Sequence, residues 1–431
     1  MMGKSEPRGF AAVIFSSVFG AVLEWYDFIL YGALSALVFN KIFFPQEDPR
    51  VGTLLAFTTF AIGFLARPVG GYILGRLGDR IGRKPVLIIT MVIIGVSTGL
   101  MGCMPTYSNI GVWAAVLLVV LRLIQGFALG GEFGGAVVLV TETASPNRRG
   151  WWAAWPQAGG PAGVLLAVGT LSILGFFTTP PQFLAWGWRV PFFVSVIVAC
   201  WGLWMRQGVE ESPIYREAEQ KAKATLQDPA WKVFMHPGPL LRAWGVRLLE
   251  NTAFYLFGIF VVSYATSTSV GYSRGVALHV ATVGAAFQLA AILVGGWVSD
   301  LVGRKLVMIC ASIGLMIWAP IFFHLVDSHD VGALYLAVIV GLTLHGFLAG
   351  PEAAWLIELF PTRHRYIGAS LAFQGSSIFA GGPAPLIASA LLIATGSIWP
   401  VAGYIVVCGV VALIALFMSG ETFKHDLRST N

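Results

Sequence analysis

Long apolar runs separated by short polar loops are the main feature of this sequence. A helix that spans a membrane needs about 20 mostly apolar residues, and twelve runs reach that length. The runs cover residues 11–39, 52–75, 85–104, 112–141, 151–177, 188–206, 242–266, 276–298, 306–325, 332–359, 367–394 and 399–418. Backbone groups in lipid must be hydrogen-bonded within the protein, and these runs are far longer than barrel strands. The pattern therefore predicts an all-α integral membrane protein with twelve transmembrane helices.

Composition and charge support this topology. Of 431 residues, 57% are hydrophobic and only 11% are charged, whereas soluble domains are about 25% charged. The termini and even-numbered loops hold 20 of the 27 Lys and Arg residues, and the odd-numbered loops hold 4. Positive charge gathers on the cytoplasmic side of membrane proteins, so both termini are expected in the cytoplasm. The net charge of +6 is explained by this bias, and no nucleic-acid partner is expected.

Two polar loops share one motif. Residues 75–84 and 296–305 both read Gly-x-x-x-Asp-x-x-Gly-Arg-Lys, and each follows an apolar run. Three further pairs of segments recur in the same order at offsets of 220 to 226: 23–32 with 249–258, 125–132 with 345–352, and 159–162 with 381–384. The chain is therefore expected to contain two copies of one six-helix unit.

The repeat predicts the domain organisation. We expect a bundle of six helices over 1–206, a polar cytoplasmic linker over 207–239 that allows the halves to move, and a second bundle over 240–431. Within the linker, residues 214–226 are compatible with a helix. Transporters built from such parallel repeats bind substrate between the halves, near the middle of the bilayer.

Several motifs together resemble the metabolite:proton symporter family of the Major Facilitator Superfamily. The segments that carry the resemblance are 24–28, 40–45, 64–71, 75–84, 122–126, 130–132, 186–192 and 210–213. Residues 155–163 look most like shikimate-type permeases, although Phe133 stands where those members have Trp.

The resemblance implies a secondary active transporter that imports a small organic anion, shikimate-like or a dicarboxylate, by proton symport. It also implies a monomer in the bacterial inner membrane that needs no cofactor or metal and works by alternating access. Proline/betaine members carry a long C-terminal coiled coil, and only a short tail follows the last span here, so we do not expect the osmosensing subtype.

Eight ionisable residues fall within the predicted spans: Glu24, Asp27, Arg67, Arg122, Glu132, Arg247, Glu250 and Glu352. A charge at the bilayer centre costs at least about 2.5 kcal/mol, so these side chains must face a wet cavity or one another. Their helical spacing puts polar stripes on the first, fourth, seventh and tenth spans. These stripes are expected to line a central path.

Residue chemistry suggests roles along this path. Planar guanidinium groups bind carboxylates in two-pronged fashion, which favours Arg122 and Arg247 as substrate ligands. Acidic residues within spans mark proton pathways, and the candidates are Glu24, Asp27, Glu132 and Glu250. Side chains suited to read substrate hydroxyls are Gln125, Tyr31, Asn251, Tyr255, Gln157 and Gln374.

Structural alternatives stay open for several of these residues. Arg122 and Glu132 can instead pair with other helices, and Arg67 lies near enough to the cytoplasmic end to reach its interface. His345 and Glu352 are possible site residues, and His345 can equally be a satisfied interior histidine.

The family resemblance implies that the two motif loops form a cytoplasmic gate. The residues involved are Gly75, Asp79, Gly82, Arg83, Lys84, Asp300, Gly303, Arg304 and Lys305. Asp79 and Asp300 can accept hydrogen bonds from adjacent arginines and from free N–H groups at a helix start. The alternative is that the loops only supply topology-setting charge. Glu142 and Glu358, at helix ends, are either solvated or part of the gate.

Three other functions compete with anion import. The first is symport of a zwitterionic osmolyte. The second is an integral-membrane enzyme, but the sequence has no HExxH or GxxxxGK[ST] motif, so an enzyme is not expected. The third is a channel, which would not need gated, duplicated loops.

Overall fold

All twelve predicted spans are helices. The structure, a computed structural model, describes residues 10–46, 49–208, 211–212, 214–215, 237–267, 270–423 and 426–427. The six long helices of the first half are α1 (Phe10–Leu34), α3 (Pro49–Ile81), α4 (Arg83–Cys103), α6 (Trp113–Thr143), α7 (Arg149–Phe177) and α9 (Val190–Gln207). Those of the second half are α12 (Gly238–Phe254), α14 (Arg274–Val302), α15 (Arg304–Val326), α16 (Val331–Glu358), α17 (Arg365–Ser376) continued by α18 (Pro383–Thr395), and α19 (Trp399–Phe417).

Three spans contain a segment of π-helix that the apolar pattern does not predict. These segments are η1 (Ser35–Phe39), η4 (Tyr255–Phe260, followed by α13, Val261–Ala265) and η6 (Ser377–Gly381). π-helical turns often occur at functional sites. The remaining short helices are α2 (Asn40–Ile42), α5 (Tyr107–Ile110), α8 (Pro180–Ala185), η2 (Pro146–Arg148), η3 (Gly187–Arg189) and η5 (Thr362–His364).

Eleven helical segments among the described residues are long and apolar enough to cross a membrane. The twelfth predicted span, 52–75, lies within α3, whose 33 residues are more than enough to span a bilayer. The predicted twelve-helix membrane architecture is therefore confirmed at the level of helices.

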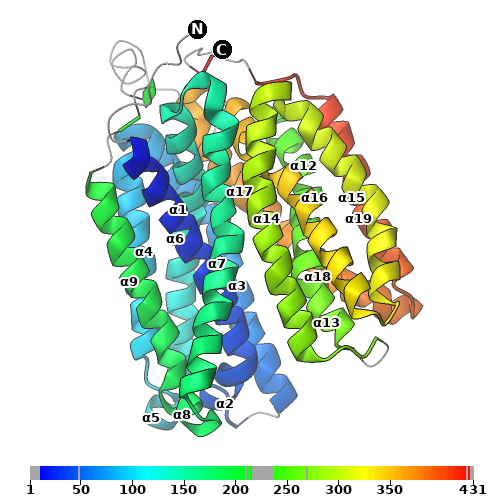
Figure 1. The fold of residues 1–431 in the computed structure, drawn as a ribbon. Helices are drawn as coiled ribbons and strands as arrows, with labels where there is room; N and C mark the ends of the chain where they lie inside the picture. The colour runs from blue at the N-terminus through cyan, green and yellow to red at the C-terminus, as the bar shows by residue number, and fades with distance from the viewer. Residues whose placement is uncertain are drawn as a thin grey trace.

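The helices form two bundles that stand side by side. In Figure 1, α1 to α9, coloured blue to green, make one bundle, and α12 to α19 make the other, with both labelled termini at one end. Most of the predicted linker over 207–239, including nearly all of its expected helix, lies outside the described residues.

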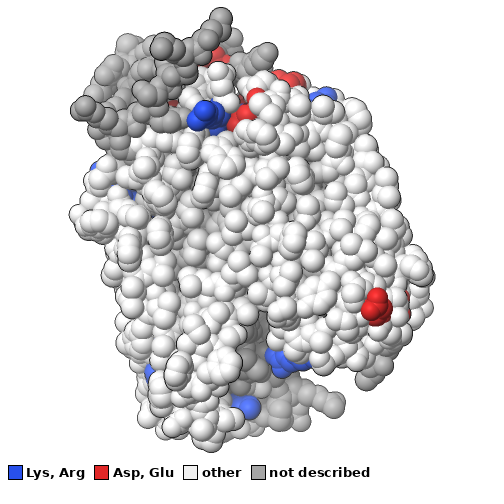
Figure 2. Space-filling view, in the orientation of Figure 1, with Lys and Arg blue, Asp and Glu red and all other residues white. Residues whose placement is uncertain are grey.

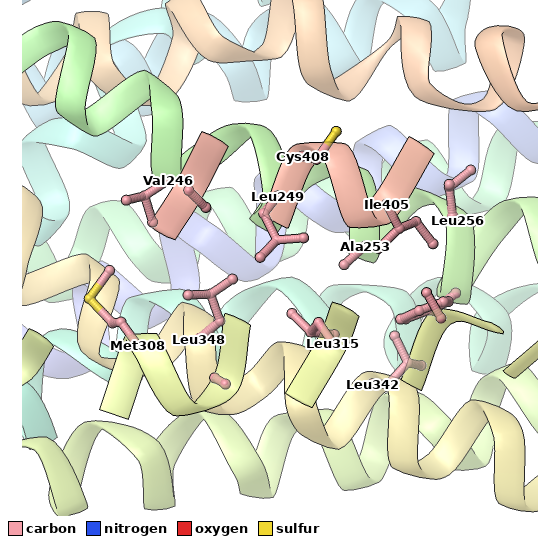
Figure 3. Packing of buried hydrophobic residues seen from close by; sticks show 14 of the residues in the cluster. Val246, Leu249, Ala253, Leu256, Met308, Leu315, Leu342, Leu348, Ile405 and Cys408 are labelled. Carbon is pink, nitrogen blue, oxygen red and sulfur yellow. The ribbon is translucent and has the colours of Figure 1, made fainter. Parts of the chain in front are cut away.

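Apolar side chains fill the space between helices within each bundle. Figure 3 shows this packing in the second half, where Leu249 of α12, Leu315 of α15, Leu348 of α16 and Ile405 of α19 meet. Large apolar side chains also cover the outside, and Figure 2 shows an almost uncharged belt between two charged ends. An apolar exterior around an apolar core is what a lipid solvent requires.

The two halves touch along two seams. α17 packs against α3 and α6, and α7 packs against α14. Gly75 of α3 lies so close to α17 that a Cβ there would be 2.7 Å from the Ile367 Cα, so only glycine permits this approach. Figure 2 shows the surface hollowed between the halves at the end opposite to the termini.

Candidate functional site

Carboxylates of the two motif loops cross from one half to the other. Asp79 accepts hydrogen bonds from the backbone N–H groups of Tyr366 (3.3 Å) and Ile367 (3.1 Å) at the start of α17. Asp300 accepts from Gly150 (2.9 Å) and Trp151 (2.8 Å) at the start of α7. Each carboxylate satisfies free N–H groups at the positive end of a helix dipole, as the sequence predicts.

An arginine of the same motif pairs with each of these two carboxylates. Arg83 lies 3.3 Å from Asp79, and Arg304 lies 2.6 Å from Asp300. Glu142 pairs with Arg83 (3.4 Å) and, across the seam, with Arg365 (2.8 Å). A solvated position for Glu142 is therefore wrong, because its carboxylate is buried in this network.

Glu358 repeats the arrangement in the other half. It pairs with Arg304 at 3.5 Å, is buried, and accepts a 2.5 Å hydrogen bond from the Thr422 hydroxyl. The solvated position is therefore wrong for Glu358 as well. Gly82 and Gly303, the second glycines of the motifs, have φ of +104° and +102°, a conformation that side chains strongly disfavour.

Two acidic residues that sequence reasoning left without a role hold the loops in place. Glu211 accepts from the backbone N–H of Lys84 (3.1 Å). Glu421 accepts from the N–H groups of Arg304 and Lys305, both at 3.1 Å. They were detectable in principle, because each half ends with Glu followed by Ser or Thr shortly after its last span.

A cleft lies between the halves in the middle of the molecule. The lining residues come from both halves: Glu24, Trp25, Arg67, Phe133, Gln157, Gly160, Pro161, Arg247, Glu250, Asn251, Phe254, Tyr255, Gln288, Ile292, His345, Phe373, Gln374 and Ser377.

Aromatic contacts between the halves border this cleft. Trp25 meets Phe254 with ring centroids 4.9 Å apart, and Phe28 meets Tyr255 at 6.4 Å. Phe28 lies one helical turn after Glu24 in α1, farther from the end of the molecule where both termini lie. The aromatic side chains therefore partly close the cleft on that side.

On the first half, the cleft wall carries one ion pair. Arg67 of α3 lies 3.2 Å from Glu24 of α1, and both residues are buried. The Arg67 guanidinium also lies 4.7 Å from the centre of the Phe64 ring. The possible position of Arg67 at the cytoplasmic interface is therefore wrong, since it lies at the cleft.

On the second half, Arg247 of α12 is the centre of a larger cluster. Its guanidinium lies 3.2 Å from Glu352 and 3.4 Å from Glu250. It also donates to the Ser376 hydroxyl at 2.9 Å and lies 4.5 Å from the centre of the Phe373 ring. One arginine thus contacts two carboxyl groups at the cleft wall.

Predicted amide and phenol ligands also reach the cleft. Asn251 donates to the carbonyl of Arg247 at 2.9 Å. Gln374 donates to the Leu129 carbonyl across the seam at 3.2 Å. Gln157 and Tyr255 line the cleft as well.

Other predicted site residues lie inside the first bundle rather than along the cleft. Asp27 accepts from Thr98 (2.7 Å), Ser195 (2.6 Å) and Gln125 (3.0 Å). These donors come from α4, α9 and α6 and surround the carboxylate. The polar face of α6 therefore turns toward α1 and α4.

Arg122 and Tyr31 belong to the same interior network. Arg122 donates to Gln125, and its guanidinium lies 4.2 Å from the centre of the Tyr31 ring. The Tyr31 hydroxyl is 2.7 Å from that of Thr59. Neither residue is part of the cleft lining described above.

Glu132 forms a second interior ion pair, with Arg206 of α9, and accepts from the Thr90 hydroxyl. Sequence reasoning missed Arg206, because it ends a span and reads as one more cytoplasmic-side charge. A Cβ at Gly20 of α1 would overlap the Glu132 carboxylate and lie 2.6 Å from Arg206 Nη2.

We expect Gly20→Ala to lower the thermal unfolding temperature of the purified protein, because overpacking costs about 1–3 kcal/mol. Gly169→Ala, in α7, is the control, since a Cβ there meets nothing within 4 Å. Equal unfolding temperatures for the two variants would contradict this view of the buried pair.

The chain is similar in sequence to known membrane transporters. The family model described as "Sugar (and other) transporter" matches residues 13–234. The shikimate transporter of Escherichia coli K12 is 38% identical over 404 residues, which are 93% of this chain and 92% of that protein. The chain belongs to the Major Facilitator Superfamily of transporters.

Other transporters match over a similar share of this chain. The proline/betaine transporter of Salmonella typhimurium LT2 is 33% identical, with 95% of this chain and 83% of that protein covered. The solved proton:xylose symporter XylE, bound to 6-bromo-6-deoxy-D-glucose, superposes with a TM-score of 0.81 at 18% identity over 98% of both chains. The Major Facilitator fold of two six-helix bundles is thereby confirmed, and the membrane-enzyme alternative is excluded.

Proposed function

We propose that the protein imports a small organic monocarboxylate, shikimate-like in class, together with protons, by alternating exposure of the central cleft. The observation that carries this proposal is Arg247, a guanidinium at the cleft wall with two acidic neighbours. A carboxylate substrate can replace one of these neighbours at the same donor groups.

Charge balance favours a monoanion over a dicarboxylate. Arg67 and Arg247 face three carboxyl groups, those of Glu24, Glu250 and Glu352. Both cations are therefore already matched, and each further negative charge in the cleft requires the uptake of a proton by the site. The neutral amides and phenol of the lining suit the hydroxyls of a polar ring acid.

Protons enter the proposal at the cluster around Arg247. A proton taken up by Glu250, Glu352 or a neighbouring group would weaken the hold of these acids on Arg247 and free the guanidinium for substrate. Asp27 and Glu132 remain candidate proton carriers inside the first bundle. They would exchange protons with the cleft only after a rearrangement of helices.

We further propose that the motif-loop network is the cytoplasmic gate. With both termini in the cytoplasm of an inner-membrane protein, as charge distribution favours, the network closes the cytoplasmic end. Opening would separate Asp79 from α17 and Asp300 from α7, while residues 1–206 and 240–431 move as two bodies of a monomer joined by the linker 207–239.

A zwitterion such as betaine is the second candidate substrate. The rings of Trp25, Phe254 and Tyr255 line the cleft beside Glu24 and Glu250, and aromatic faces bind quaternary ammonium groups. The similarity to a proline/betaine transporter is in line with this alternative.

Counterflow in proteoliposomes tests the proposal and separates the candidates. Vesicles containing the purified protein are loaded with shikimate, and the entry of labelled shikimate is measured with excess α-ketoglutarate, proline or betaine outside. The proposal expects exchange that unlabelled shikimate competes and betaine does not. Exchange of labelled betaine in betaine-loaded vesicles, without exchange of shikimate, supports the second candidate, and absence of exchange when each of the four compounds is loaded and labelled in turn overturns both.

A further inference from the structure

The two halves present equivalent carboxyl groups to the cleft, but the partners of these groups differ. Glu24 and Glu250 correspond in the repeat at offset 226. Glu24 pairs with Arg67, which is always charged. Glu250 instead has Arg247 on one side and His345 on the other, with the His345 Nε2 3.4 Å from its Oε1.

The repeat also explains how His345 is held. At the offset of 221 that relates the motif loops, Arg67 corresponds to Gln288 of α14. The Gln288 side-chain Nε2 lies 2.7 Å from the His345 Nδ1. A glutamine thus stands where the first half has its fixed cation, and an imidazole is placed between this glutamine and the carboxyl group.

The hydrogen bond orients the imidazole. When the Gln288 amide donates, Nδ1 accepts, so the neutral ring carries its proton on Nε2. That nitrogen faces Glu250 and has no other hydrogen-bond partner among the described residues. His345 is 2% exposed, and the Phe254 ring lies 5.6 Å away on the cleft side.

The charged groups around this pair are few and come from several helices. Arg247 of α12 and Glu352 of α16 lie on one side, and Glu24 of α1 and Arg67 of α3 face the pair across the cleft. Histidine is the side chain whose charge ordinarily changes near physiological pH, and it is the member of this group best placed to add and lose a proton during a transport cycle.

We propose that His345, positioned by Gln288, is the coupling switch of the second half, and that the Glu24–Arg67 pair of the first half is a fixed counterpart. This inference rests on the proposed function. One proton from the outside adds to the neutral imidazole, and Gln288 turns its carbonyl toward the new Nδ1–H. The imidazolium then holds Glu250, and the Arg247 Nη2 that faced Glu250 is free to bind the substrate carboxylate.

The cycle balances one proton against one anion. After the cleft opens to the cytoplasm, the substrate leaves Arg247, Glu250 returns to the guanidinium, and the imidazolium gives its proton to cytoplasmic water. No net charge accumulates in the site, which is required of a group buried in a membrane. Gln288 acts through His345 and is therefore a positioning residue.

The test compares two activities in the same proteoliposomes: exchange of labelled shikimate at equal pH, and its accumulation under an inside-alkaline pH gradient. The readout is the ratio of accumulation to exchange, so that a general loss of binding cancels. We expect His345→Gln to lower this ratio at least ten-fold and to flatten the pH dependence of exchange. A ratio and a pH profile equal to those of the wild type would overturn the proposal.

A second pair of variants keeps the test informative if His345→Gln exchanges too slowly to measure. Gln288→Leu retains the imidazole without its partner and should lower the same ratio, and Gln288→Glu, which can accept from Nδ1–H, should restore it. An unchanged ratio in Gln288→Leu would overturn the positioning role. His279→Gln is the matched control, because His279 lies on α14 outside the cleft lining and contacts Tyr335.

The outcome is separable from the fate of the proposed function. If the wild-type protein exchanges no carboxylate, the proposed function is wrong. If it exchanges shikimate and accumulates it with protons while the His345 and Gln288 variants behave as wild type, only the coupling switch is wrong.

Discussion

Arg247→Lys is expected to lower the efficiency of substrate uptake by about 10- to 100-fold, mainly through weaker binding. Lysine keeps the positive charge between Glu250 and Glu352 but loses the planar fork that binds a carboxylate through two donors. A hydrogen bond to a charged group contributes about 1.5–3 kcal/mol, and 1.36 kcal/mol corresponds to a factor of ten. Initial uptake rates over a range of shikimate concentrations measure the change.

The lysine variant is preferable to alanine because removal of the cation would leave buried carboxyl groups uncompensated, which destabilises a protein by about 3–5 kcal/mol. Arg242→Lys, on the same helix, is the control, since Arg242 lies outside the cleft lining and donates to the backbone carbonyls of Gly238 and Met418. Normal uptake by Arg247→Lys would remove Arg247 from the proposed substrate site.

Gly135→Ala should impair transport by more than ten-fold, because it disrupts the seam between α6 and α17. Tyr366 of α17 is fully buried in a slot of the first half, where its hydroxyl donates to the Gly131 carbonyl at 2.9 Å. A Cβ at Gly135 would overlap the Tyr366 hydroxyl, so the tyrosine must leave and the closed seam is lost. Uptake and labelling of Ser370→Cys by a membrane-impermeant thiol reagent measure the effect.

A double-mutant cycle makes this prediction specific. In a Tyr366→Ala background the clash is absent, so Gly135→Ala should add little further loss. The labelling is performed without the four native cysteines, three of which are exposed. Gly175→Ala is the control, because a Cβ there meets nothing within 4 Å. Additive losses, or unchanged labelling of position 370, would contradict the proposed seal.

Much of the fold follows from one-dimensional patterns. The twelve apolar runs correspond to helices because length and backbone hydrogen bonding leave a membrane segment few choices. The hydrogen bonds of Asp79 and Asp300 to helix starts in the other half are predictable for a similar reason. A carboxylate in such a loop finds few partners besides the adjacent arginines and the free N–H groups at the start of a helix. The π-helical turns, such as Tyr255–Phe260, have no comparable signal, because the same apolar residues continue through them.

The site was less predictable, since periodicity defines a face of a helix but not which neighbour that face meets. Arg122 and Asp27 share faces with polar residues as expected, yet those faces turn into the first bundle. Arg67 lies on a helix outside the four predicted polar stripes, and it nevertheless faces the cleft. Gln288 was detectable through the repeat, because it occupies the position that corresponds to Arg67.

The central claim is that substrate and proton cross together through the cleft between the halves. The most direct measurement is accumulation of labelled shikimate in proteoliposomes under an inside-alkaline pH gradient, with and without a protonophore. The account predicts accumulation above the external concentration that the protonophore abolishes. Entry that stops at the external concentration, with or without the gradient, would contradict it.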